Sequence, residues 1–165
     1  MAATYEPIST TTLTSSQTGV VFSGITSTYT DLLIVVNANT NSAGQAWVST
    51  NSSGASLFTS VRMSGSGGAG GTEIYSGQDE WMLTGGSDVS TQGASFNAII
   101  HIFDYSNTNK FKGMLARCGA SGTATFVVAG VCRSLSAINT VSVDLTGSNT
   151  YVAGSTFTLY GIKAA

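Results

Sequence analysis

The hydrophobic and polar positions of this chain follow short periods that predict strands. The strongest apolar run covers residues 32–36, within a segment from 29 to 39 that begins with turn formers and ends in asparagines. Five residues are too few to cross a membrane, and the run has no apolar partner at helical spacing. Because it is rich in β-branched side chains, the run predicts a strand buried on both faces at the centre of a sheet.

Further apolar segments predict additional strands. Residues 96–105 form a second strong apolar strand, and residues 57–63 alternate with a period of two. Other candidate strands cover residues 18–22, 45–49, 72–75, 80–83, 110–118, 123–132, 137–145 and 155–163. The Gly-Ser segment 64–71 predicts a flexible loop between strands. About ten strands at this spacing predict an all-β fold, a jelly-roll-like antiparallel sandwich in which residues 15–165 form one domain.

The first fourteen residues predict either an extended arm or an edge strand. Pro7 has no backbone N–H to donate, which only an edge position tolerates. As an arm, the segment would add main-chain pairing to an adjacent subunit, with Tyr5, Glu6, Pro7 and Ile8 as candidate assembly residues. Deleting such an arm should weaken attachment and leave the sandwich folded.

The composition adds a weakly charged surface to this picture. Only 8% of the residues are charged, against roughly 25% in an ordinary domain. Hydroxyls take their place, with 24 Ser and 23 Thr. The net charge is −2, and the six Lys and Arg residues are scattered, so no basic patch for nucleic acid is expected. A surface with so little charge is poorly protected against self-association, which favours an assembly over a hydroxyl-covered monomer.

The sequence also indicates the cellular compartment in which the protein is expected. The first residues have neither a basic nor an apolar signal region, and no apolar window approaches a membrane span, so neither export nor a membrane is expected. Cys118 and Cys132 fall on the two strands of a predicted hairpin, too far apart along the strands for a disulfide. Two free thiols are therefore predicted, which fits a reducing compartment.

No motif in the sequence predicts catalysis. Residues 65–70 match G-x-G-x-x-G, but the following residues 72–77 do not form the helix that a dinucleotide site needs. His101 is the single histidine, and its neighbours predict a core or interface position. No G-x-S-x-G elbow is present, and one histidine with two distant thiols does not make a metal site. We therefore expect no enzyme, no cofactor and no catalytic or metal residues.

The aromatic residues and the arginines each give one further prediction. Trp47, Tyr75 and Trp81 are the aromatic residues nearest to predicted loops, where sugar-binding sandwiches stack pyranose rings; core or interface packing is the alternative. Three arginines in predicted strands are expected to form structural ion pairs with three strand-borne aspartates. These residues are Arg62, Arg117 and Arg133, with Asp31, Asp104 and Asp144.

Several segments together resemble a family of small virion proteins of tailed bacteriophages. The first is Tyr-Glu-Pro-Ile at residues 5–8, with Thr-Tyr-Thr-Asp-Leu at 28–32. The second is Arg-Ser-Leu-Ser-Ala-Ile-Asn at 133–139, and the third is Gly-Ser-Thr-Phe-Thr-Leu-Tyr-Gly-Ile-Lys at 154–163. Their order and spacing cover nearly the whole chain. Family members often carry Trp at the position of Cys132.

The resemblance implies a non-enzymatic part of the virion, assembled in the host cytoplasm. The expected role is an oligomeric, specifically trimeric, capsid decoration or cement protein that contacts copies of itself and the major capsid protein. The alternative is a tail-fibre or host-surface carbohydrate-binding module that stacks a host glycan on Trp47, Tyr75 and Trp81.

Overall fold

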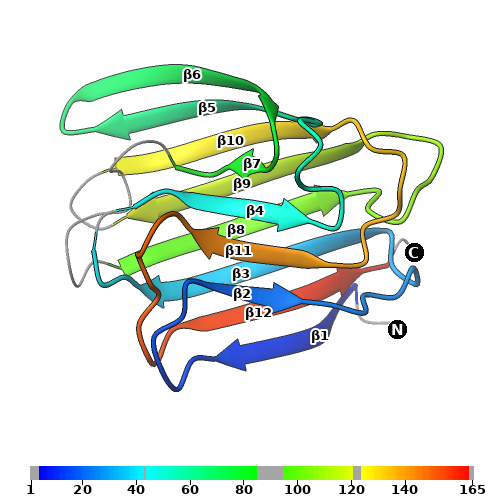
Figure 1. The fold of residues 1–165 in the computed structure, drawn as a ribbon, viewed down its shortest axis with the longest axis horizontal. Coiled ribbons are helices and arrows are strands. Elements are labelled where there is room, and N and C mark those ends of the chain that lie inside the picture. The colour runs from blue at the N-terminus through cyan, green and yellow to red at the C-terminus, as the bar shows by residue number, and fades with distance from the viewer. Residues whose placement is uncertain (1–3, 43, 85–94, 121–123, 164–165) are drawn as a thin grey trace.

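The computed structural model describes residues 4–42, 44–84, 95–120 and 124–163, which fold into two antiparallel sheets packed face to face (Figure 1). All regular elements of these residues are strands, so the predicted all-β sandwich is confirmed. The strands are β1 (Tyr5–Thr12), β2 (Gly19–Phe22), β3 (Asp31–Asn39), β4 (Ala46–Thr50), β5 (Phe58–Ser66), β6 (Ala69–Gln78), β7 (Trp81–Met82), β8 (Ser95–Phe103), β9 (Lys112–Ala120), β10 (Ala124–Cys132), β11 (Val141–Leu145) and β12 (Thr156–Ile162).

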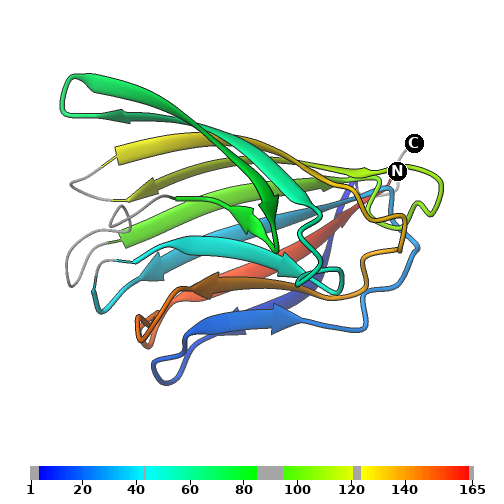
Figure 2. The same ribbon diagram turned by 45° about the horizontal axis from the view of Figure 1, so that its top comes forward.

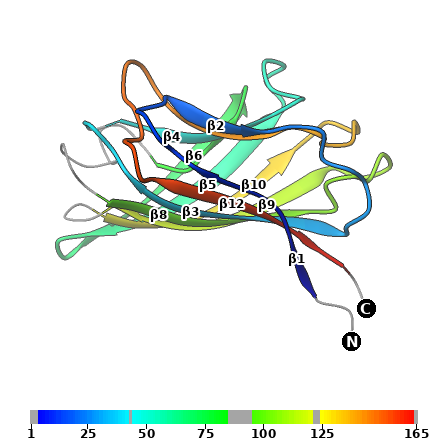
Figure 3. The same cartoon turned by 90° about the horizontal axis from the view of Figure 1, so that it is seen from below.

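The two sheets differ in size. The larger sheet has eight strands in the order β1-β12-β3-β8-β9-β10-β5-β6, and the smaller has four in the order β2-β11-β4-β7. Figure 3 shows the two sheets as layers, and Figure 1 shows that β5 and β6 extend past the smaller sheet. One side of the larger sheet therefore packs on the smaller sheet over most strands, and its other side faces outward.

The Gly-rich segment 64–71 is a tight hairpin and not the predicted flexible loop. Strands β5 and β6 continue through it and are joined by Gly67 and Gly68, whose φ angles are 55° and 90°. Two consecutive positive φ angles are typical of the two-residue turn that matches the twist of a hairpin. The glycines therefore allow the β5–β6 ladder to run to its end, with Ser66 opposite Ala69.

The first segment is an edge strand of the larger sheet, which is one of the two predicted alternatives. Strand β1 pairs with β12 of the same chain from Tyr5–Ile162 to Thr12–Thr156, with an irregularity between Pro7 and Ser9. The side chains of Glu6 and Lys163 form an ion pair at 2.9 Å. Ile8 packs against the core of its own sandwich, so this part of the chain is not a free arm. Residues 1–3 lie outside the described residues.

Strand β3 lies near the middle of the larger sheet, but it is buried on one face only. Leu32, Ile34 and Val36 point into the core between the sheets and are buried. Leu33 and Val35 point to the other side and are only partly covered. The prediction that this strand is covered on both faces is therefore wrong within the single chain.

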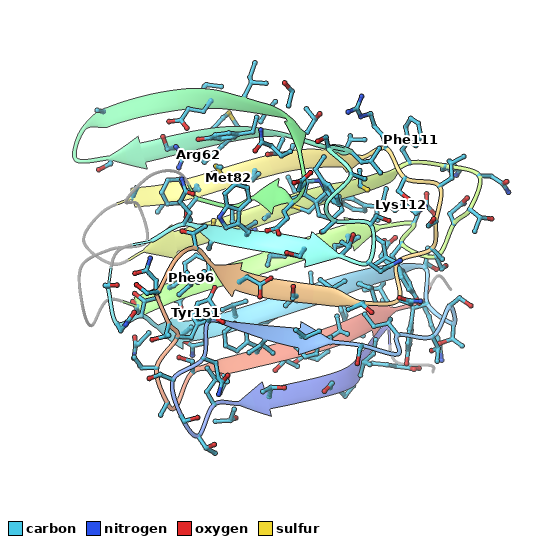
Figure 4. The ribbon with its side chains drawn as sticks, in the orientation of Figure 1. Arg62, Met82, Phe96, Phe111, Lys112 and Tyr151 are labelled. Carbon is cyan, nitrogen blue, oxygen red and sulfur yellow. The ribbon has the colours of Figure 1, made fainter. Side chains whose placement is uncertain are left out.

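Among the described residues, two charged side chains are buried, Arg62 and Lys112 (Figure 4). The Arg62 guanidinium lies 5.0 Å from the ring centroid of Phe126 and 2.7 Å from the carboxylate of Glu73, which is directly opposite on β6. Pairing across the hairpin gives Arg62 a glutamate, and not one of the aspartates predicted. The aspartates have other partners: His101 for Asp31, Lys110 for Asp104, and Ser49 and Ser142 for Asp144.

Both cysteines are buried and free, as predicted. Cys118 on β9 is opposite Phe126, and Cys132 on β10 is opposite Lys112. Six residues of strand separate these two positions, which is about 20 Å at the rise of an antiparallel strand. The sequence predicts the turn of this hairpin at residues 119–122; residues 119 and 120 instead end strand β9, and residues 121 and 122 lie outside the described residues.

Candidate assembly interface

The outer side of the larger sheet carries large apolar side chains on six neighbouring strands, β3, β8, β9, β10, β5 and β6. We call this surface the outward face. Cross-strand pairing sets its side chains in two rows. The first row is Leu33, His101, Leu115, Ala129, Val61 and Ile74, and the second is Val35, Ile99, Arg117, Val127, Met63 and Thr72.

These side chains are more exposed to solvent than apolar side chains usually are. Ile74 is 72% exposed and Met63 55%, and Leu115 is also exposed. Single apolar residues on a surface need no explanation, but a contiguous apolar patch marks an interaction site. Because neighbouring strands place these side chains side by side, the outward face is one such patch.

The outward face stands out against the rest of the protein surface. The adjoining strands β12 and β1 present hydroxyls there, and the Thr10 and Thr158 side chains hydrogen-bond to each other at 3.2 Å. On the outer side of the smaller sheet, β11 carries Ser142 and Asp144. An ordinary antiparallel sheet has one apolar and one polar face. The six strands of the outward face break this rule.

Two shallow hollows lie on the outward face. One has a volume of about 570 Å³ and is lined by Val35, Ile99, Arg117 and neighbouring residues. The other, of about 390 Å³, is lined by Tyr5, Leu33, Ile99, His101, Leu115 and Arg117. Tyr5 is thus the one candidate assembly residue of the first segment whose side chain borders the outward face. A partner with protruding side chains would fit these hollows.

One positive charge lies among the apolar side chains. Arg117 is exposed between Ile99 and Val127, and within the described parts of the chain its guanidinium has no hydrogen bond or ion pair. Arginine is enriched at protein interfaces, where it forms charge-assisted hydrogen bonds with a partner. The outward face therefore offers a partner carboxylate a binding group inside an apolar surround.

The outward face also contains the single histidine. The Nε2 atom of His101 lies 3.1 Å from a carboxylate oxygen of Asp31, and its ring centroid is 4.0 Å from that of Phe103. The other carboxylate oxygen of Asp31 accepts the backbone N–H of Asp104 at 2.9 Å. The sequence predicted a core or interface position for His101, and the structure gives it a partly buried position on a candidate interface.

The three aromatic residues considered for sugar stacking do not form one site. Trp81 is fully buried, with its indole edge-on to Phe58 at 5.0 Å, so no sugar ring can stack on it. Tyr75 lies on β6, where its hydroxyl donates to Glu73. Trp47 remains, on the outer side of β4.

Trp47 borders a cavity of about 440 Å³ at the edge of the smaller sheet. The cavity is also lined by Gln78, Asp79, Glu80, Asp144, Leu145 and Thr146. Burial raises the pKa of Glu80, and the nearby Asp144 adds to the rise. The combination of an indole with carboxylate and amide groups is chemically suited to polyhydroxylated ligands.

The described residues hold neither a group of three metal-ligating side chains nor a helix long and apolar enough to cross a membrane. The sequence pattern missed the outward face, because its rows depend on the order of strands and not on local spacing. Its one sequence signal was the two-sided apolar character of residues 32–36.

No protein-family model matches the chain, and no curated protein is significantly similar to it.

Proposed function

We propose that this chain is a non-enzymatic structural protein of a tailed-bacteriophage virion, which acts as a homo-oligomeric capsid decoration or cement protein. The observation that carries the proposal is the outward face, whose apolar side chains on six neighbouring strands have no cover within the described chain. The sequence resemblance supplies the virion context and the expected trimer. The weakly charged surface agrees with a protein that is covered by neighbours.

The mechanism of such a protein is adhesion. Burying Leu115, Val127 and Met63 against a neighbour removes apolar surface from water, at about 25 cal/mol per Å². Arg117 restricts how the neighbour can be oriented, because its guanidinium, once buried by the neighbour, is stabilised only where the neighbour presents a carboxylate or carbonyl oxygen. Apolar burial thus supplies the free energy of association, and Arg117 selects the partner and its orientation.

The proposal is tested with one charge placed on each of two surfaces. Val127→Asp puts a carboxylate in the outward face, and Val21→Asp is the matched control, because Val21 is 61% exposed on the smaller sheet. We expect wild type and Val21→Asp to form the same oligomer in sedimentation velocity, and to co-sediment with phage heads that lack the protein. Val127→Asp should form a smaller assembly than the wild type and should not bind the particles, with an unchanged circular dichroism spectrum.

A wild-type chain that stays monomeric at all concentrations and does not bind particles would overturn the proposal. Equal behaviour of the two variants would show that the outward face takes no part in assembly. A cryo-EM map of the particle would show where the protein is bound.

The cavity beside Trp47 favours one second candidate, a tail-fibre or host-surface module that binds a glycan. Trp47→Ala should then abolish binding on a glycan array. Tyr75→Ala is the control, because Tyr75 lies on the other sheet and does not line this cavity. An array with no signal for the wild-type protein would exclude this candidate.

A further inference from the structure

The two edges of the larger sheet differ in their protection against another strand. At the β1 edge, Pro7 lacks an N–H, an irregularity follows it, and the Glu6–Lys163 ion pair lies beside it. Prolines, bulges and charged side chains are the usual devices that keep an edge strand from pairing. At the β6 edge, residues 69–75 pair regularly with β5 and contain neither proline nor lysine.

Strand β6 is also open to approach. It is exposed along most of its length, and in Figures 1 and 2 the β5–β6 hairpin extends beyond the smaller sheet. Its one charged residue, Glu73, is already bound by the Arg62 guanidinium. Among the described residues, neither an unpaired charge nor a covering element therefore prevents another strand from pairing with this edge.

The sequence of β6 is complementary in size to itself. An antiparallel pairing of residues 69–75 with the same residues of a second copy has its centre at Thr72. Residues 73, 74 and 75, which are large, then lie opposite residues 71, 70 and 69, which are small. The opposed pairs are Glu73 with Gly71, Ile74 with Gly70, and Tyr75 with Ala69. Large side chains thus meet the flat backbone of small residues, and the two Glu73 carboxylates do not face each other.

We propose that the β6 edge binds the β6 edge of a second copy of this chain, antiparallel across a two-fold axis at Thr72. A two-fold contact uses one edge twice, so it does not need the protected β1 edge. The main chains supply hydrogen bonds, and Ile74 of each copy extends the apolar outward face of the other. The inference rests on the proposed function in one respect, that the partner is a second copy of this chain. The two-fold contact is separate from any contact that the outward face makes.

Cysteine cross-linking tests the position of the axis. Residues directly opposite each other in an antiparallel pair have Cβ atoms about 4.5–5.5 Å apart, close enough for a disulfide after a small adjustment. We expect Thr72→Cys to give a covalent dimer on mild oxidation, seen on a non-reducing gel. Wild type should give none, because Cys118 and Cys132 are buried. The matched control is Ser9→Cys, an exposed position on the β1 edge, which should also give none.

A failure to cross-link Thr72→Cys, or equal cross-linking of Ser9→Cys, would overturn the inference. A second measurement does not depend on a disulfide. Thr72→Lys should abolish the protection from hydrogen exchange that amides of residues 69–75 gain with rising protein concentration. Thr125→Lys, an exposed threonine on the same side of the sheet but away from the edge, should retain it. No gain of protection in the wild type would count against the pairing.

The Val127→Asp variant separates this inference from the proposed function. If Thr72→Cys fails to cross-link and association remains sensitive to Val127→Asp, the outward face assembles the protein and the edge pairing is wrong. If Thr72→Cys cross-links equally well in the Val127→Asp background, the edge pairing is correct and independent of the outward face.

Discussion

Gly130 on β10 is a position where the core leaves no room for a side chain. A Cβ atom placed there would lie 2.6 Å from Cδ1 and 2.8 Å from Nε1 of Trp81, and 3.2 Å from the backbone oxygen of Thr59. Trp81 is fully buried and packs against Phe58, so it has no free space to move into. The absence of a side chain at Gly130 is what admits the indole.

Gly130→Ala should therefore destabilise the protein, by about 1–3 kcal/mol, the usual cost of overpacking a core. The control is Gly65→Ala on β5, where the nearest atom to an added Cβ is Thr125 Oγ1 at 3.9 Å. Urea unfolding at one protein concentration would measure both. Equal stability of the two variants would mean that Trp81 can repack.

Several buried acids share one direction of pKa shift. Burial raises the pKa of the Cys118 thiol to about 12, and it also raises the pKa of Tyr105, Tyr151 and Cys132. In the unfolded chain these groups lose their protons at lower pH than in the folded chain. Their contribution to stability is complete below the unfolded pKa and is lost as the pH rises through the folded one. Lys112, whose pKa is lowered by burial, acts in the opposite direction.

Stability should consequently fall between about pH 9 and pH 12. Cys118→Ala should make the fall less steep by up to about 1.4 kcal/mol per pH unit, the value for one proton. The slope is the informative quantity, because the substitution also removes packing at all pH values. Denaturant unfolding from pH 8 to pH 11 would measure it, with an unchanged slope as the contrary result.

At the scale of elements, β1 shows what the first segment does for its own chain. It covers one side of β12 over seven residue pairs, and the buried Leu13 that follows it hydrogen-bonds through its backbone to Ser155. Each cross-strand pair contributes roughly 0.2–1 kcal/mol. The strand is therefore a structural part of the sheet.

Deleting residues 1–12 should lower the stability by a few kcal/mol at these values. This differs from the effect expected of a free arm, whose loss leaves the fold intact. Deleting residues 1–4 alone is the control, because it keeps β1. Thermal unfolding of the two truncated chains would compare them, and equal melting temperatures would show that β1 contributes little.

The sequence predicted the strands of this fold better than their arrangement. Residues 32–36 and 96–105 contain enough apolar residues to mark strands β3 and β8 by themselves. The position of Leu115 beside His101 could not be predicted, because it depends on which strands pair. The run 32–36 also has the same pattern whether its second face is covered by its own chain or by another protein. Local sequence does not distinguish these cases.

At the scale of the whole molecule, the two sheets of eight and four strands leave an apolar outer surface with few charges. Association through such a surface is governed by the hydrophobic effect. Screening by salt has little effect on it, because Arg117 is the one unpaired charge of the outward face among the described residues.

Association should therefore strengthen on warming from 5 to 25 °C and change less than tenfold between 50 and 500 mM NaCl, since hydrophobic association is driven by entropy in this range. Sedimentation equilibrium would measure both dependences. A loss of association of more than tenfold with salt would indicate that charges, and not apolar burial, hold the subunits together.

The position of β12 between β1 and β3 has a consequence for synthesis. The ribosome makes β12 after every other strand, yet β12 joins the first strand of the larger sheet to the rest. During translation β1 has no partner, and the apolar core stays incomplete until residues 156–162 emerge. The larger sheet is therefore completed through pairings distant in sequence, which are slow to form. Until β12 is in place, the unpaired edges of β1 and β3 are the kind of exposed strand edge that is prone to aggregation.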